Sequence, residues 1–105
     1  MKVFHHTFAA EAILREGFRD GRGRIEDLVL EGVWISDRPL EEQDGARGDV
    51  HLVLEIPEPD IESFEVLEEG PKHYREWCVP ARTLNRFPVA IHEETDETIL
   101  EEPDE

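Results

Sequence analysis

The chain has 105 residues, the size of one domain with a single modest core, so a second domain is not expected. Its 27 acidic and 11 basic residues give a formal net charge of −16 at pH 7. That charge disfavours docking on phosphate backbones and on anionic lipid, so nucleic acid and membranes are poor candidate partners. No stretch approaches the ~18 apolar residues of a membrane span, and no signal peptide is recognisable, so we expect a cytoplasmic protein.

The first 18 residues predict a short strand followed by a helix. Residues 3–5 form the strand, and residues 9–16 consist of strong helix formers. Thr7 can cap the start of this helix, and Gly17 can end it in a left-handed conformation. Phe18 can then fold back onto the helix.

The middle of the chain predicts two strands separated by a long loop. Residues 20–23 contain two glycines and predict a loop, and residues 29–36 are β-branched and aromatic, with an interruption at Gly32. Residues 38–49 are polar and predict a long loop. Residues 50–56 alternate apolar and other side chains, the pattern of a half-buried strand.

The last third predicts three more strands. Residues 64–67, 75–79 and 89–91 are the candidates, with one helical turn over residues 81–85. Cys78 is the single cysteine, so a disulfide framework is excluded. We interpret it as a small buried apolar side chain, with a nucleophilic role as the less common alternative. The predicted fold class is α+β, a sheet with one main N-terminal helix.

The composition changes after Ile91. Residues 93–105 hold eight acidic side chains and no basic one. We therefore predict a folded domain over residues 1–92 and an acidic, flexible tail over residues 93–105. The alternative is an electrostatic arm for a basic partner.

Three short stretches occur in a telling order. Residues 3–7 read Val-Phe-His-His-Thr and lead into the predicted helix, residues 32–37 read Gly-Val-Trp-Ile-Ser-Asp, and residues 74–80 read Tyr-Arg-Glu-Trp-Cys-Val-Pro. Together they resemble the ADP-ribosyltransferase superfamily, in its poly(ADP-ribose) polymerase and diphtheria-toxin-like branch. That branch has an aromatic-His-Gly-Thr/Ser strand before a helix, then a Gly-x-Tyr strand, and late in the chain a strand with a catalytic Glu.

The resemblance implies a small single domain with the superfamily's split β-sheet, and NAD as its substrate. By position, His5 corresponds to the histidine that binds a ribose hydroxyl and the carboxamide side of NAD, and Thr7 completes that motif. Trp34 falls where the family tyrosine packs against nicotinamide. Glu76 corresponds to the catalytic glutamate. We expect His5, Trp34 and Glu76 to converge on one cleft.

The chemistry agrees with these residue types, although each has a plainer reading. Cleavage of the nicotinamide glycosidic bond passes through an oxocarbenium-like centre, which a carboxylate such as Glu76 stabilises. The plain alternatives are a solvent-facing strand glutamate, a structural strand histidine at His5 and a core aromatic at Trp34. We predict no metal site, because His5 and His6 are adjacent in a strand and point apart.

The sequence also departs from the family pattern. His6 stands in place of the family glycine, Trp34 in place of tyrosine, and residues 40–49 lack the second aromatic ring of polymerase relatives. Tyr74 lies two residues before Glu76, where arginine-directed transferases often have Glu or Gln, and this argues against arginine as the acceptor.

Four functions remain open on these grounds. The first is an enzyme that transfers ADP-ribose from NAD to an unknown acceptor, possible protein acceptors included, or hydrolyses NAD. The second is a non-catalytic module on the same fold that binds a nucleotide or a protein. The third, an RNA 2′-phosphotransferase, is disfavoured by the net charge of −16. The fourth is an interaction protein that works through its acidic tail.

Overall fold

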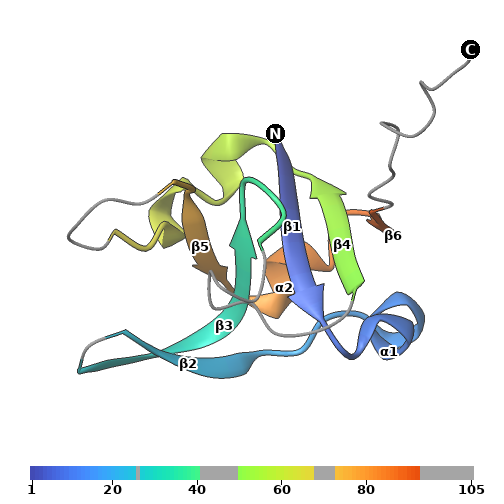
Figure 1. The fold of residues 1–105 in the computed structure, drawn as a ribbon, viewed down its shortest axis with the longest axis horizontal. Coiled ribbons are helices and arrows are strands. Elements are labelled where there is room, and N and C mark those ends of the chain that lie inside the picture. Colours follow the sequence, from blue (N-terminus) through green and yellow to red (C-terminus); the bar gives the residue numbers. More distant parts are fainter. Residues whose placement is uncertain (26, 41–49, 68–72, 93–105) are drawn as a thin grey trace, which may run out of the picture.

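The computed structural model describes residues 1–25, 27–40, 50–67 and 73–92, apart from the side chains of residues 24 and 25. The sequence predicts an α+β domain, and the structure confirms that class: a mostly antiparallel sheet with short helices (Figure 1). The described elements are β1 (Lys2–Thr7), α1 (Ala10–Glu16), β2 (Gly21–Ile25), β3 (Leu28–Ser36), β4 (Val50–Glu55), the 3₁₀ helices η2 (Glu58–Asp60) and η3 (Glu62–Phe64), β5 (Glu76–Val79), α2 (Ala81–Leu84) and β6 (Val89–Ile91).

The sheet branches at β3. Its main order is β2-β3-β1-β4-β6, and β5 also pairs with β3. β2 pairs with β3 from Leu28 to Gly32, whereas β5 pairs with it from Val33 to Ser36. Figure 1 shows β1 on one side of β3 and β5 on the other. β1 pairs with β4 over its whole length but meets β3 at the single pair Phe4–Ser36. The two strands therefore separate beyond that pair.

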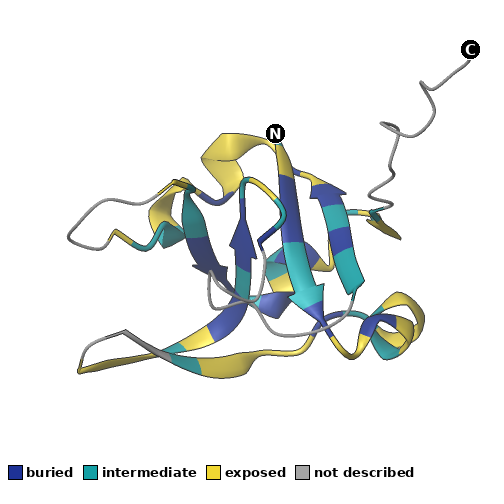
Figure 2. Cartoon of the chain, in the orientation of Figure 1, coloured by how far each residue is buried: buried dark blue, intermediate teal, exposed yellow. Residues whose placement is uncertain are grey.

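The core lies on one face of the sheet. Leu52 and Leu54 alternate with more exposed neighbours along β4, the period of a half-buried strand (Figure 2), and both are almost fully buried, as is Val3 of β1. Trp77 of β5 is completely buried on this face. The elements that cover it contribute Ala10, Phe18, Ile61, Ala81 and Leu84.

Most of the predicted elements are confirmed. The strands expected at residues 3–5, 50–56, 75–79 and 89–91 are β1, β4, β5 and β6, and the helix and helical turn are α1 and α2. The strand expected at residues 29–36 is β3, but the interruption expected at Gly32 is wrong: β3 is continuous, and at Gly32 its pairing partner changes from β2 to β5. Gly17 ends α1 with a φ of 92°.

Two predicted elements were wrong. Residues 20–23 were expected in a loop, but Gly21 to Ile25 form β2, because backbone pairing with β3 needs no favourable side chains. Residues 64–67 were expected to form a strand, but η3 occupies the start of this segment, and Glu65 makes only an isolated bridge to Trp77.

Thr7 has a different role from the helix cap predicted for it. The helix begins after Ala9, without a side-chain cap, and Thr7 Oγ1 instead accepts a hydrogen bond from the Ala9 N–H at 2.8 Å. This bond closes the turn that joins β1 to α1.

Some predictions fall outside the described residues. They are the acidic tail, residues 93–105, and most of the long loop, residues 41–49. Within the described residues, the helices lack the length and apolar character that a membrane span requires.

Candidate functional site

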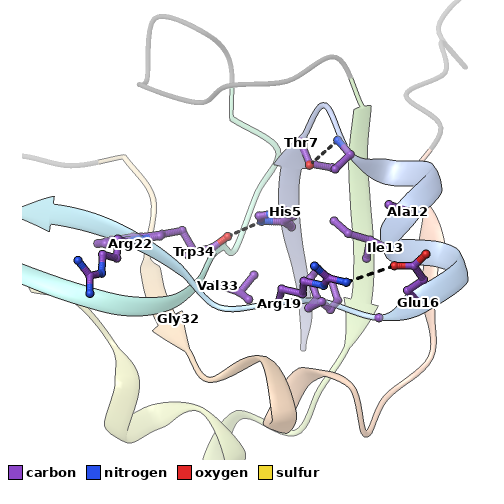
Figure 3. Close-up of a pocket in the computed structure, with 14 residues that line it drawn as sticks. His5, Thr7, Ala12, Ile13, Glu16, Arg19, Arg22, Gly32, Val33 and Trp34 are labelled. Carbon is purple, nitrogen blue, oxygen red and sulfur yellow. Dashed lines mark hydrogen bonds and ion pairs between the residues drawn. The ribbon is translucent and has the colours of Figure 1, made fainter.

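A pocket of about 480 Å³ opens where β1 and β3 separate (Figure 3). β1 and β3 form its walls, α1 and the segment that follows it form another side, and the start of β2 completes it. The lining residues are His5, Thr7, Ala9, Ala12, Ile13, Glu16, Gly17, Phe18, Arg19, Gly21, Arg22, Gly32, Val33 and Trp34. This volume lies in the range of small-molecule sites.

His5 spans the gap between the two strands. Its Nδ1 lies 2.8 Å from the carbonyl oxygen of Trp34. A carbonyl oxygen can only accept, so Nδ1 carries the hydrogen and donates it. Burial lowers the pKa of His5 below its ordinary value, and the neighbouring His6 lowers it further, while the bond to Trp34 opposes both. The ring is therefore neutral at pH 7, and its Nε2 has a lone pair that can accept a hydrogen bond.

Phe18 packs against His5 and is itself held from α2. The two rings meet edge to face with centroids 5.5 Å apart. Asn85, the residue after α2, accepts from the Phe18 N–H through Oδ1 at 2.7 Å and donates through Nδ2 to the Phe18 carbonyl at 3.1 Å. This two-point contact fixes the backbone of Phe18 beneath the pocket. The orientation of His5 therefore depends on a residue 80 positions later in the chain.

Two arginines, Arg19 and Arg22, line the pocket of this strongly acidic chain. Arg19 pairs with Glu16 at 3.5 Å, and Arg22 pairs with Glu31 at 3.2 Å. All four side chains are largely exposed, and exposed pairs of this kind contribute only about 0–1 kcal/mol. An anionic ligand can therefore compete with these glutamates at little cost.

Trp34 lies along β3 towards β2. Its ring fills the space above Gly23, where an added Cβ would lie 2.5 Å from Nε1. The Nε1 atom is buried and has no hydrogen-bond acceptor among the described residues. A buried donor in this state is destabilising until an acceptor reaches it.

Glu76 does not line this pocket. It pairs with Ser36 on β3, which pairs with Phe4 on β1, so these three residues share the sheet face opposite to His5. Trp34 pairs with Cys78 and belongs to the face of Glu76, which makes the two diagonal neighbours, roughly 7–8 Å apart. Glu76 is half-buried and lies beside the pocket wall rather than within it.

The structure thus brings together three of the four predicted site residues. His5, Thr7 and Trp34 line one pocket, and the expectation that Glu76 joins them there is not met, because β5 pairs with β3 along the side away from β1 (Figure 1). The sequence interpretation missed Arg19 and Arg22. A signal for them existed: they are basic residues directly after a glycine-terminated helix in a strongly acidic chain.

Cys78 is buried, as predicted from its apolar neighbours, although it lies on the face of the sheet opposite to Trp77. It is 8% exposed, and burial raises the pKa of its thiol, with the charges of Asp20 and Glu76 adding to the rise. A thiol in this state is a weak nucleophile. Among the described residues, no group of three or more His, Cys, Asp and Glu side chains is placed to hold a metal ion.

Comparisons with protein-family models, with curated proteins and with solved structures found no match for this chain.

Proposed function

We propose that the chain is an NAD-dependent ADP-ribosyltransferase built on the split sheet of that superfamily, or an NAD glycohydrolase when no acceptor is present. The observation that carries the proposal is His5, a neutral histidine fixed to the Trp34 carbonyl in a pocket between two separating strands. The single cysteine suits a reducing compartment, so a cytoplasmic location is part of the same proposal.

Each part of the pocket has a counterpart in NAD. A ribose hydroxyl can donate to Nε2 of His5, and the apolar wall formed by Ile13, Val33 and Phe18 suits a planar ring. The hydroxyl of Thr7 accepts from the Ala9 N–H and still has its own hydrogen to donate. The exposed guanidinium groups of Arg19 and Arg22 suit the diphosphate.

In this proposal Glu76 acts on a ligand that extends from the pocket across β3. The glycosidic bond breaks with its electron pair leaving on nicotinamide, and the acceptor then bonds to the ribose carbon and loses a proton. The carboxylate of Glu76 would stabilise the positive charge on the ribose during this step. Its diagonal position relative to Trp34 is the structural support for this role.

A second candidate is a non-catalytic module that binds the same nucleotide or a protein. The observation in its favour is the place of Glu76 outside the pocket lining. A fold can keep a binding site and lose its chemistry, so binding and turnover have to be measured separately.

Titration of the protein with NAD, followed by NMR, tests the binding that both candidates share. We expect shift changes at His5, Thr7 and Val33, and a dissociation constant about tenfold higher for His5→Asn, which keeps a donor for Trp34 but loses the Nε2 acceptor. The control is His73→Asn at an exposed position. Shift changes confined to other residues, or equal affinity in His5→Asn, would rule out this pocket.

A further inference from the structure

The segment between α1 and β2, residues 17–20, forms part of the pocket wall but is held by an element outside the pocket. Gly17, Phe18 and Arg19 of this segment line the pocket, whereas no residue of α2 does. α2 is fixed in its own right, because Ala81 and Leu84 are buried in the core. It can therefore serve as a support for the segment from behind.

α2 holds the segment at two points. Asn85 makes the two hydrogen bonds to the Phe18 backbone described above. The second point is Asp20, whose Oδ1 accepts a hydrogen bond from the Ala81 N–H at 2.7 Å. Pro80, which precedes α2, makes no side-chain cap bond, so Asp20 satisfies the first N–H of this helix from the opposite end of the chain.

Arg19 is the one residue between these two anchors. Its backbone lies outside the strands and helices, unlike that of Arg22, which is fixed by its pairing with Glu31 in the β2–β3 ladder. The Arg19 side chain is 84% exposed and meets Glu16 at 3.5 Å (Figure 3). Such a pair contributes little, so the guanidinium can exchange Glu16 for an anionic ligand while its backbone stays in place.

The charge of Asp20 and its hydrogen bond have opposite expected effects on an anionic ligand. A carboxylate close to the pocket repels a diphosphate. The bond to Ala81 favours binding instead, because an ordered backbone at Arg19 removes the cost of ordering it when the ligand arrives. Since Asp20 does not line the pocket, mutation can separate the two effects without removing a ligand contact.

We propose that Asp20 is a positioning residue for the diphosphate-binding part of the pocket. Its bond to Ala81 fixes the backbone of Arg19, and the Arg19 guanidinium then meets the diphosphate in an orientation that is already set. Asp20 acts through Arg19 and does not touch the ligand. This inference rests on the proposed function, because it takes a diphosphate as the ligand of Arg19.

Calorimetry with ADP-ribose tests the proposal on two variants of one residue. Asp20→Ala should weaken binding about fivefold, because the acceptor for Ala81 is lost. Asp20→Asn keeps an oxygen acceptor and removes the charge, so it should bind at least as tightly as the wild type. If Asp20→Ala also binds at least as tightly as the wild type, only the charge matters and the proposal is overturned.

A double-mutant cycle shows through which residue Asp20 acts. Asp20→Ala should have little further effect on ADP-ribose binding in the Arg19→Gln background, and its full effect in the Arg22→Gln background. Equal losses in the two backgrounds would contradict an action through Arg19.

Asp37→Ala is the matched control for lost stability. Asp37 Oδ1 accepts from the Arg75 N–H at 2.9 Å, a bond of the same kind, and Asp37 does not line the pocket. This variant should bind ADP-ribose as the wild type does. A loss equal to that of Asp20→Ala would assign the effect to stability and not to positioning.

NMR relaxation of the backbone amides, measured without ligand, separates this proposal from the proposed function. The order parameter of Arg19 should fall in Asp20→Ala and keep its wild-type value in Asp20→Asn. An unchanged Arg19 in Asp20→Ala would overturn the positioning role even if NAD binds. Wild-type protein that binds neither NAD nor ADP-ribose would instead contradict the proposed function and the ligand named for Arg19, whatever the order parameters show.

Discussion

His5 and Trp34 are joined by a 2.8 Å hydrogen bond across strands that are no longer paired at that level. The bond runs from the His5 Nδ1–H to the Trp34 carbonyl, so it fixes both the orientation of the ring and its tautomer. It also links the first strand to the strand at which the sheet branches. The pocket is therefore a product of the sheet's divergence, and His5 is the side chain that spans it.

The first prediction concerns the pH dependence of stability. The pKa of His5 is 6.5 in an ordinary environment and lower in the folded chain, mainly because of burial. Between these two values the unfolded chain binds a proton that the folded chain does not, so the free energy of unfolding falls as the pH drops below about 6.5. His5→Asn should remove this contribution and flatten the curve just below that pH.

Urea denaturation at a series of pH values measures this effect. His73→Asn, at an exposed position with no comparable burial, should leave the wild-type slope unchanged. If His5→Asn loses stability with falling pH as steeply as the wild type, the neutral, buried state of His5 is wrong.

The second prediction concerns the contact between β2 and Trp34. A Cβ at Gly23 would lie 2.5 Å from Trp34 Nε1, whereas at Gly21 its nearest neighbour would be 3.8 Å away. Gly23→Ala should therefore destabilise the fold by about 1–3 kcal/mol or displace the indole, as overpacking does. Gly21→Ala is the matched control and should change stability much less. Thermal melts and the indole N–H resonances report the two effects, and equal behaviour of both variants would contradict the packing described.

The third prediction concerns Asn85. Asn85→Ala leaves the N–H and the carbonyl of the part-buried Phe18 backbone without their partner, which should cost about 1–3 kcal/mol. Because Phe18 packs on His5, the His5 ring resonances should shift as well. The neighbouring Arg86→Ala changes an exposed residue and should do neither. A stable Asn85→Ala with an unchanged His5 would show that α2 does not position the pocket.

The fourth prediction concerns which part of NAD is bound by Arg19 and Arg22. Arg19→Gln and Arg22→Gln should weaken binding of NAD and of ADP-ribose but not of free nicotinamide, since only the first two carry the diphosphate. The loss should shrink at high salt, because both arginines are exposed. Arg82→Gln, at an exposed position on α2, is the control. Calorimetry measures all three ligands, and equal losses for nicotinamide would contradict a phosphate role.

The alternation of apolar residues, the runs of helix formers and the residues that end helices and strands were enough to predict most of the fold. The apolar period of β4, the helix formers of α1 and the proline after β5 are local signals, and each element formed where its signal lay. β2 had no such signal, because Gly23 is required by the Trp34 ring that packs on it, a contact made only in the folded chain. The segment after η3 had strand-like residues but found only one bridge.

The site was predicted in part for a similar reason. Motif order indicated that His5, Thr7 and Trp34 belong together, and they line one pocket. Glu76 lies outside the pocket because β5 pairs with β3 on the side away from β1, and this long-range pairing is not encoded by any local pattern. Asn85 was missed for the same reason, because its role depends on a long-range hydrogen bond to Phe18.

Release of free nicotinamide from NAD tests the central proposal most directly. The wild type should release nicotinamide, and Glu76→Gln, which keeps the shape but removes the charge, should still bind NAD while turnover falls by ~10²-fold or more. Wild-type protein that binds NAD and releases no nicotinamide would contradict the enzyme and leave the binding module. Release by Glu76→Gln at the wild-type rate would show that this carboxylate, outside the pocket lining, takes no part in the reaction.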